Sequence, residues 1–239
     1  MPCQAAAAET ATLHASFTPD RPGASTTIGF GFQLANTDGE LPAPLSGVTL
    51  RLPPGIDYLT TTLGLAICQP AALLAHGLSG CPANSRLGFG SALVEVPFGT
   101  GSGHEIPDIQ ALMGPPRNGN IVVLFYADGQ APVYAQIVLA GELIEGTDTL
   151  GGRLETPVPL IPSITAGPPV SILSVQTTIG PNGLIYHERR HGRLVSFHPK
   201  GVSVPEHCPR HGFRFWAVFD FIDGTSSEAA STVACPRHR

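Results

Sequence analysis

The chain has 239 residues and a formal net charge of −5, and only 13% of its residues are charged. This length is enough for one large all-β domain or two smaller ones. The mild negative charge, without any long run of basic residues, argues against a nucleic-acid-binding protein, because such proteins neutralise phosphates with lysine and arginine. The 28 glycines and 24 prolines favour many short elements over long helices.

Residues 1–9 are expected to be an unstructured N-terminus. They contain Cys3 and a run of four alanines, without the basic and long apolar stretches of a visible signal peptide, so we interpret the run as the remnant of one. The alternatives are a lipid-attachment role for Cys3 and an intact cytosolic start. No transmembrane segment is expected, because the most apolar stretch, residues 63–78, is shorter than a membrane span and is interrupted by polar residues.

Alternating apolar and polar residues predict β-strands along most of the chain. The first are expected at residues 12–17, 27–34 and 48–52, and in the second of these Ile28, Phe30 and Phe32 share one face. Further strands are predicted at residues 87–97, 120–127, 133–143, 170–179, 193–197, 213–222 and 227–234. One short helix is predicted between Cys68 and Cys81, because proline begins residues 70–76 and glycine follows them.

Residues 27–58 contain a strand, the turn Asn36-Thr37-Asp38-Gly39, a second strand and the sequence Leu52-Pro53-Pro54-Gly55. This arrangement resembles bacterial surface Ig-like repeat domains, in which one strand ends in a comparable turn and the next ends in a Leu-Pro-x-Gly motif. The whole chain is similar to exported actinobacterial proteins with paired Cys-Pro motifs. Both resemblances imply a protein of the cell surface, and neither supplies catalytic residues.

The strand pattern predicts an all-β fold of one or two Ig-like or jelly-roll β-sandwiches, with the short helix as its one helical element. The glycine-rich run at residues 99–103 is our preferred domain boundary. It divides the chain into an N-terminal Ig-like sandwich at residues 10–103 and a C-terminal sandwich at residues 104–239. His104, Glu105 and Asp108 follow this run, and we interpret them as solvated loop residues rather than a cation site.

Four of the five cysteines form two local pairs, Cys68 with Cys81 and Cys208 with Cys235. We predict two structural disulfides, and therefore a location outside the reducing cytosol, extracellular or at the cell surface. The alternative for the second pair is a zinc site, because Cys208-Pro209-Arg210-His211 and Cys235-Pro236-Arg237-His238 together offer two thiolates and two imidazoles.

The sequence His187-Glu188-Arg189-Arg190-His191 matches the H-E-x-x-H pattern of zinc hydrolases. That chemistry needs both histidines on one face of a helix, with the glutamate activating a zinc-bound water. The flanking glycines Gly183 and Gly192 favour a strand, a turn and a second strand instead. We therefore prefer a solvated hairpin tip, and keep His187 and His191 as alternative metal ligands.

Three functions remain open from the sequence. The first is a structural or adhesion module without catalytic activity or a cofactor, in contact with a cell-envelope component, a glycan or another surface protein. The second is a carbohydrate-binding module that presents the aromatic side chains of Tyr126, Tyr134, Tyr186 and Trp216, which otherwise pack in the core. The third is a zinc-dependent hydrolase that uses the His187–His191 segment.

Overall fold

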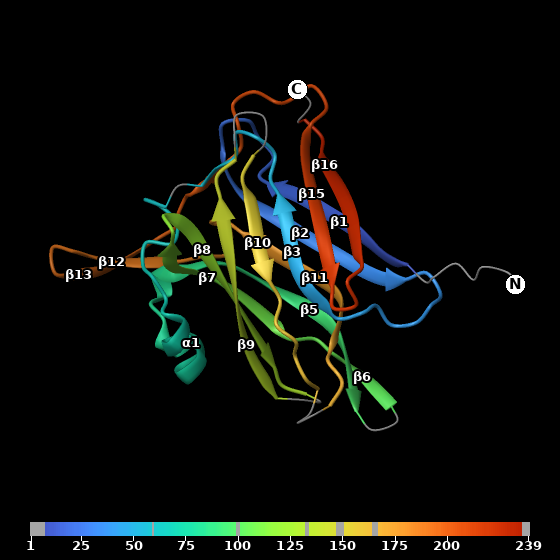
Figure 1. Ribbon diagram of the computed structural model, residues 1–239. Coiled ribbons are helices and arrows are strands. Elements are labelled where there is room, and N and C mark those ends of the chain that lie inside the picture. The colour runs from blue at the N-terminus through green and yellow to red at the C-terminus, as the bar shows by residue number, and fades with distance from the viewer. Residues whose placement is uncertain are drawn as a thin grey trace, which may run out of the picture.

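The fold is described by a computed structural model that covers residues 8–58, 60–98, 101–131, 134–146, 151–163 and 167–235. It is almost entirely β, with one short α-helix, as the sequence predicts. The strands form a large antiparallel sheet that curls round on itself until it is nearly barrel-shaped (Figure 1). No helix in these described ranges is long and apolar enough to cross a membrane.

The strands in chain order are β1 (Glu9–Thr18), β2 (Ser25–Asn36), β3 (Leu45–Arg51), β4 (Asp57–Tyr58), β5 (Arg86–Phe98), β6 (Gly101–Glu105), β7 (Asp108–Arg117), β8 (Asn120–Gly129), β9 (Ala135–Ile144), β10 (Arg153–Pro157), β11 (Ser171–Ile179), β12 (Tyr186–Arg190), β13 (Arg193–Phe197), β14 (Val202–Ser203), β15 (Phe213–Phe221) and β16 (Ser226–Val233). The helical elements are α1 (Pro70–His76) and two short 3-10 turns, η1 (Gly77–Gly80) and η2 (Ala83–Ser85).

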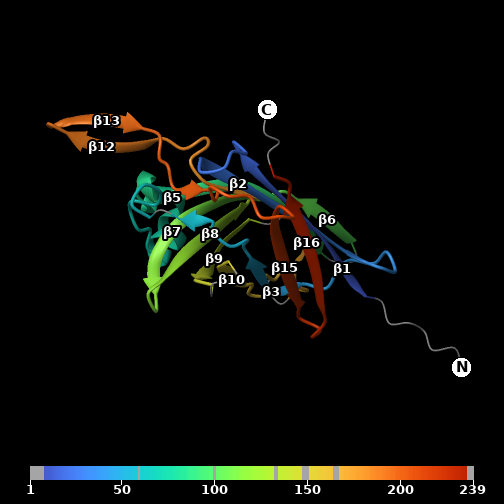
Figure 2. The ribbon, with the colours of Figure 1, turned by 90° about the horizontal axis from the view of Figure 1, so that it is seen from above.

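The main sheet has the order β16-β15-β3-β10-β9-β8-β7-β5-β11-β2-β14-β4, with β1 paired to β2 and β6 paired to β5. The curled sheet closes where β1, the partner of β2, lies beside β16. There the backbone N–H of Ala15 donates a hydrogen bond to Oγ of Ser231 at 3.1 Å. Seen from above, the strands follow a flattened ring, with β2 and β5 on one side and β9, β10 and β3 on the other (Figure 2).

The boundary expected after residue 103 falls inside this sheet. The glycine-rich run that suggested a linker leads into β6, which turns back and pairs with β5. Strands from the two expected domains also alternate, since β3 lies between β10 and β15. Of the expected unstructured N-terminus, residues 1–7 lie outside the described residues, and Glu9 already begins β1.

A phenylalanine-rich core fills the part of the fold where β1 and β2 face β15. The alternation of β15 places Phe213, Phe215 and Phe219 inside, all fully buried. The rings of Phe213 and Phe17 pack edge-on with their centroids 5.2 Å apart, and the ring centroids of Phe219 and Phe32 are 4.8 Å apart. Each buried phenylalanine contributes about 1.5–3 kcal/mol to stability.

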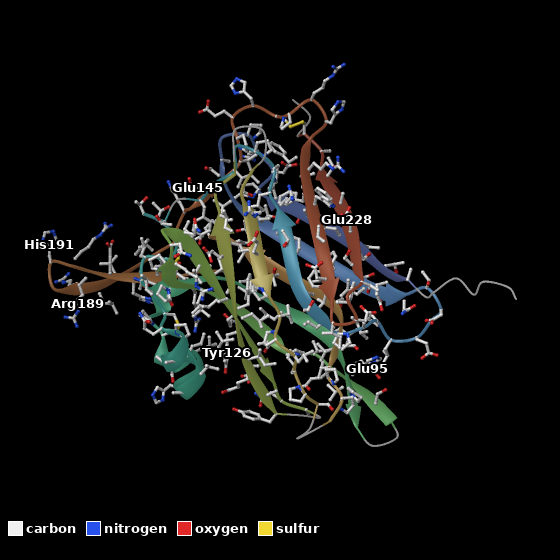
Figure 3. All side chains as sticks on the ribbon, viewed as in Figure 1. Glu95, Tyr126, Glu145, Arg189, His191 and Glu228 are labelled. Carbon is white, nitrogen blue, oxygen red and sulfur yellow. A yellow bond between two sulfur atoms is a disulfide. The ribbon has the colours of Figure 1, made fainter. Side chains whose placement is uncertain are left out.

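Helix α1 covers the outer face of β7, β8 and β9. Pro70 occupies its first turn, and Gly77 ends it with a φ of 58°, a backbone conformation that glycine adopts without strain. Its Leu73 packs against outward-facing Leu124 and Tyr126 of β8. Tyr126 lies beside this helix in Figure 3. The predicted disulfide between Cys68 and Cys81 brackets α1 and joins this outer core.

Candidate functional site

The inside of the curled sheet holds a cavity of about 870 Å³. This volume lies within the roughly 300–1,000 Å³ of pockets that bind small molecules in proteins. The wall is formed by inward-facing side chains of β2, β3, β5, β8, β9, β10 and β11, and it is mainly aliphatic and aromatic. Members of the wall include Phe30, Leu50, Val94, Val123, Phe125, Ile137, Leu139, Leu154 and Val175.

The cavity arises from side-chain size along otherwise regular strands. Where β15 faces β1 and β2, phenylalanines from both sides meet and fill the interior. Further along, β5 presents side chains such as Ala92 and Val94 to the inside, and β8 presents Ala127, although its Phe125 also lines the cavity. Strands turn alternate residues to the same face, so these small side chains line one wall together. The opposite walls therefore do not meet across the interior.

The two ends of the cavity carry most of its polar groups. At one end, which we call the Glu145 end, Asn118, Asn120 and Glu145 line the cavity, and Figure 3 shows Glu145 in the upper left part of the molecule. The opposite end, the Glu105 end, contains Glu105 and Gly129. The antiparallel pairing of β8 with β9 separates the two ends, because Ile121 pairs with Leu143 and Gly129 pairs with Ala135.

Glu105 is only 6% exposed. Its neighbour across the β5–β6 hairpin is the inward-facing Val94, so the glutamate also faces the cavity. The backbone N–H of Ala131 donates a hydrogen bond to its Oε1 at 3.2 Å. The expectation of a solvated loop residue was therefore wrong for Glu105, because the glycine-rich segment forms a paired strand and turns this side chain inward.

Two tyrosines lie near the Glu145 end. The hydroxyl of Tyr186 donates to the backbone oxygen of Arg86 and accepts from the N–H of Gly64 at 3.0 Å. Tyr58 lines the cavity, and its hydroxyl has no hydrogen-bond partner within the described part of the chain. Burial, together with the neighbouring Tyr186, raises the pKa of Tyr58, so the phenol stays uncharged.

The H-E-x-x-H segment forms a hairpin, as its flanking glycines predict. Its first four residues lie in β12, which forms a separate two-stranded sheet with β13, and His191 lies in the turn with a φ of 49°. Successive residues of a strand point to opposite faces, so His187 and Glu188 point apart. The hairpin extends away from the main sheet, with Arg189 and His191 at its far end (Figure 3). This geometry lacks the single helical face that a zinc hydrolase of this pattern uses.

Both predicted disulfides are present, with Cα–Cα distances of 4.9 Å for Cys68 and Cys81 and 5.8 Å for Cys208 and Cys235. The second bridge joins the two sulfurs that the alternative zinc site needs as thiolates. His211 is exposed, and His238 lies outside the described residues. Across the described ranges, no three His, Cys, Asp or Glu side chains are grouped closely enough to hold a metal ion.

The four aromatic residues considered for glycan binding lie on different parts of the fold. Tyr126 is buried under α1, and Tyr186 is fully buried among Leu63, Leu184 and Val202. Trp216 lies on the outer face of β15, where the guanidinium carbon of Arg51 is 5.1 Å from its ring centroid. Tyr134 is exposed. They do not form one platform for stacking a sugar.

Sequence reasoning missed the cavity. The available signal was the contrast between the phenylalanines of β15 and the smaller side chains of β5, such as Ala92 and Val94, but this contrast predicts a cavity only once it is known which strands face each other. Searches of family models, curated proteins and solved structures found no match to the chain.

Proposed function

We propose that this protein binds an elongated apolar small molecule inside the curled sheet and shields it from water. The observation that carries the proposal is the cavity of about 870 Å³ with its mainly apolar wall. Cavities lined by aliphatic side chains stay dry and take up apolar molecules, because transfer of apolar surface out of water is favourable. Such a ligand would complete the core that the small side chains of β5 and β8 leave unfilled.

The wall favours a lipid-like ligand over a glycan. A sugar carries hydroxyl groups along its whole length, and each needs a hydrogen-bond partner when it is buried. Between its two ends, the cavity presents Val, Ile, Leu and Phe side chains, with Thr156 and Thr177 as polar exceptions. A long aliphatic chain matches this surface without leaving buried polar groups unpaired.

We further propose that the protein works outside the reducing cytosol. The two disulfides support this location, since such bridges persist mainly in oxidising compartments. A carrier or store of apolar molecules beyond the cytosol fits both the bridges and the cavity. The structural or adhesion role expected from the resemblance to surface proteins remains a prediction, which ligand binding would not exclude.

The test uses Nile red, an uncharged apolar fluorophore whose emission rises out of water. Wild-type protein should give a saturable rise in fluorescence. Ala127→Phe places an aromatic ring in the cavity from β8 and should weaken this binding at least about tenfold, the equivalent of roughly 1.4 kcal/mol. Ala230→Phe, at an exposed position of β16, is the matched control and should bind as the wild type does.

Circular dichroism of both variants shows whether each retains the fold, so that a loss of binding is assigned to the cavity. Absence of Nile red binding to the wild type would contradict the proposed function. So would equal binding by Ala127→Phe and the wild type, because the dye would then be held on the outer surface.

A further inference from the structure

The polar groups of the cavity narrow the chemical class of the ligand, an inference that rests on the proposed function. Glu105 is a carboxyl group placed in a mainly apolar wall, and it is nearly inaccessible to solvent. Among the described residues its one hydrogen bond comes from Ala131, at 3.2 Å. A buried carboxylate without a cation or several donors is costly, which leaves this group in need of a further partner.

A second buried glutamate, Glu95, provides a direct contrast. It lies on the neighbouring strand β5, one residue beyond Val94, and does not line the cavity. Nε2 of His104 lies 2.7 Å from its Oε2, so the protein supplies this carboxylate with an ion-pair partner when His104 is protonated. Glu105 has no ion pair with any described residue. The two glutamates differ in their partners because their side chains point in opposite directions: Glu105 lines the cavity and Glu95 does not.

The charged side chains that line the cavity among the described residues are all negative. Within the described ranges, no lysine, arginine or histidine lines the cavity, whereas Glu105 and Glu145 stand at its two ends. A fatty-acid carboxylate would meet a like charge at either end and would find no counter-charge.

We propose that the bound molecule is a long-chain amphiphile whose polar end donates a hydrogen bond to the Glu105 carboxylate, through a hydroxyl or an ammonium group. Its chain extends from the Glu105 end towards the Glu145 end, past Ile137 and Leu139. Inward-facing residues of β9 line the cavity from Ala135 to Leu143. At about 3.3 Å per residue these eight steps span about 26 Å, a length that suits a long aliphatic chain.

The experiment measures displacement of Nile red by three compounds that share one chain and differ in the head: hexadecylamine, hexadecanol and hexadecanoate. Each is kept below the concentration at which it forms micelles. The wild type should bind the amine most tightly, the alcohol next and the acid least. Glu105→Gln should weaken binding of the amine about tenfold to a hundredfold, the value of a hydrogen bond to a charged group.

Glu95→Gln is the matched control, because it removes a buried carboxylate of the adjacent strand that does not face the cavity; it should keep the wild-type order and affinities. Equal binding of the three compounds by the wild type, or preference for hexadecanoate, overturns the inference even if Glu105→Gln fails to fold. A folded Glu105→Gln with wild-type affinity for the amine also overturns it. If neither Nile red nor any of the three compounds binds the wild type, the proposed function itself fails and this inference fails with it.

Discussion

The carboxylate of Glu105 occupies the space that a side chain on Gly129 would fill. A Cβ atom at residue 129 would lie 2.5 Å from Oε1 of Glu105, closer than two such atoms can approach. The absence of a side chain at residue 129 therefore determines where the buried carboxyl group of Glu105 can lie. A glycine on β8 therefore makes room for the carboxyl group that β6 directs into the cavity.

Gly129→Ala should move this carboxylate while keeping the fold. The atom that must shift is the far end of a flexible side chain, so we expect a change in the free energy of unfolding below about 1 kcal/mol. The preference for hexadecylamine over hexadecanol should fall, because the displaced Glu105 carboxylate no longer lies where the ammonium group of the ligand donates its hydrogen bond. Nile red displacement and urea unfolding measure the two effects. An unchanged preference would mean that the position of Glu105 does not select the ligand.

Phe219→Ala should destabilise the protein by about 3–5 kcal/mol. Phe219 is fully buried and its ring packs against Phe32 across the interior, so truncation leaves a hole that the surrounding strands cannot close. Urea unfolding followed by circular dichroism measures the loss. Leu194→Ala removes an apolar side chain that is 69% exposed, and should change stability by no more than about 0.5 kcal/mol. Similar losses in the two variants would contradict the proposed location of the core.

Replacing both Cys68 and Cys81 by serine should lower the free energy of unfolding by about 3 kcal/mol, the value expected for a closed loop of this length. The bridge closes a loop around α1, and this helix covers Leu124 and Tyr126 on the outside of the cavity wall. Denaturant unfolding of the double variant and of the wild type measures the difference. Coincident unfolding curves would contradict this prediction and show that the bridge adds no measurable stability.

The turn between β15 and β16 should make stability depend on acidity. The hydroxyl and the backbone N–H of Thr225 donate to Oδ1 of Asp223 at 2.7 and 2.9 Å, and these bonds lower the pKa of Asp223. A carboxyl group with a lowered folded-state pKa contributes stability above its unfolded pKa of about 3.9. It loses that contribution as the pH falls through the folded value.

Asp223→Ala should therefore have a lower melting temperature than the wild type at neutral pH, and the two melting temperatures should converge in strong acid. Thermal unfolding across this pH range measures the convergence. Thr225→Val removes one of the two donors and should give a smaller difference of the same sign. A difference between Asp223→Ala and the wild type that stays constant with pH would show that the turn acts through its backbone shape alone.

The local features of the fold follow from the sequence. The alternation at residues 27–34 and 213–222, the proline and glycine that bound α1, and the spacing of Cys68 and Cys81 each identify an element that the structure contains. These signals act over a few residues, where side-chain direction and backbone preference decide the outcome. The same alternation gives the inward face of β15, which consists of four phenylalanines and Ala217.

The neighbours of each strand could not be predicted in the same way. Alternation shows which residues share a face, but it does not show that β3 pairs with β10 and β15, which come much later in the chain. The position of Glu105 depends on one such pairing, between β5 and β6, which turns an apparent loop carboxylate inward. The cavity depends on several strand pairings at once, because it lies between strands that are distant in the sequence and whose inward side chains do not meet.

The interleaving of early and late strands has a consequence for how the protein is made. Strand β3 leaves the ribosome well before β10 and β15, its two partners in the sheet. Until those partners are synthesised, the nascent chain has unpaired edges and no enclosed interior, and such long-range pairing is slow. A ligand of the kind proposed would therefore enter the cavity after translation, once the sheet has closed.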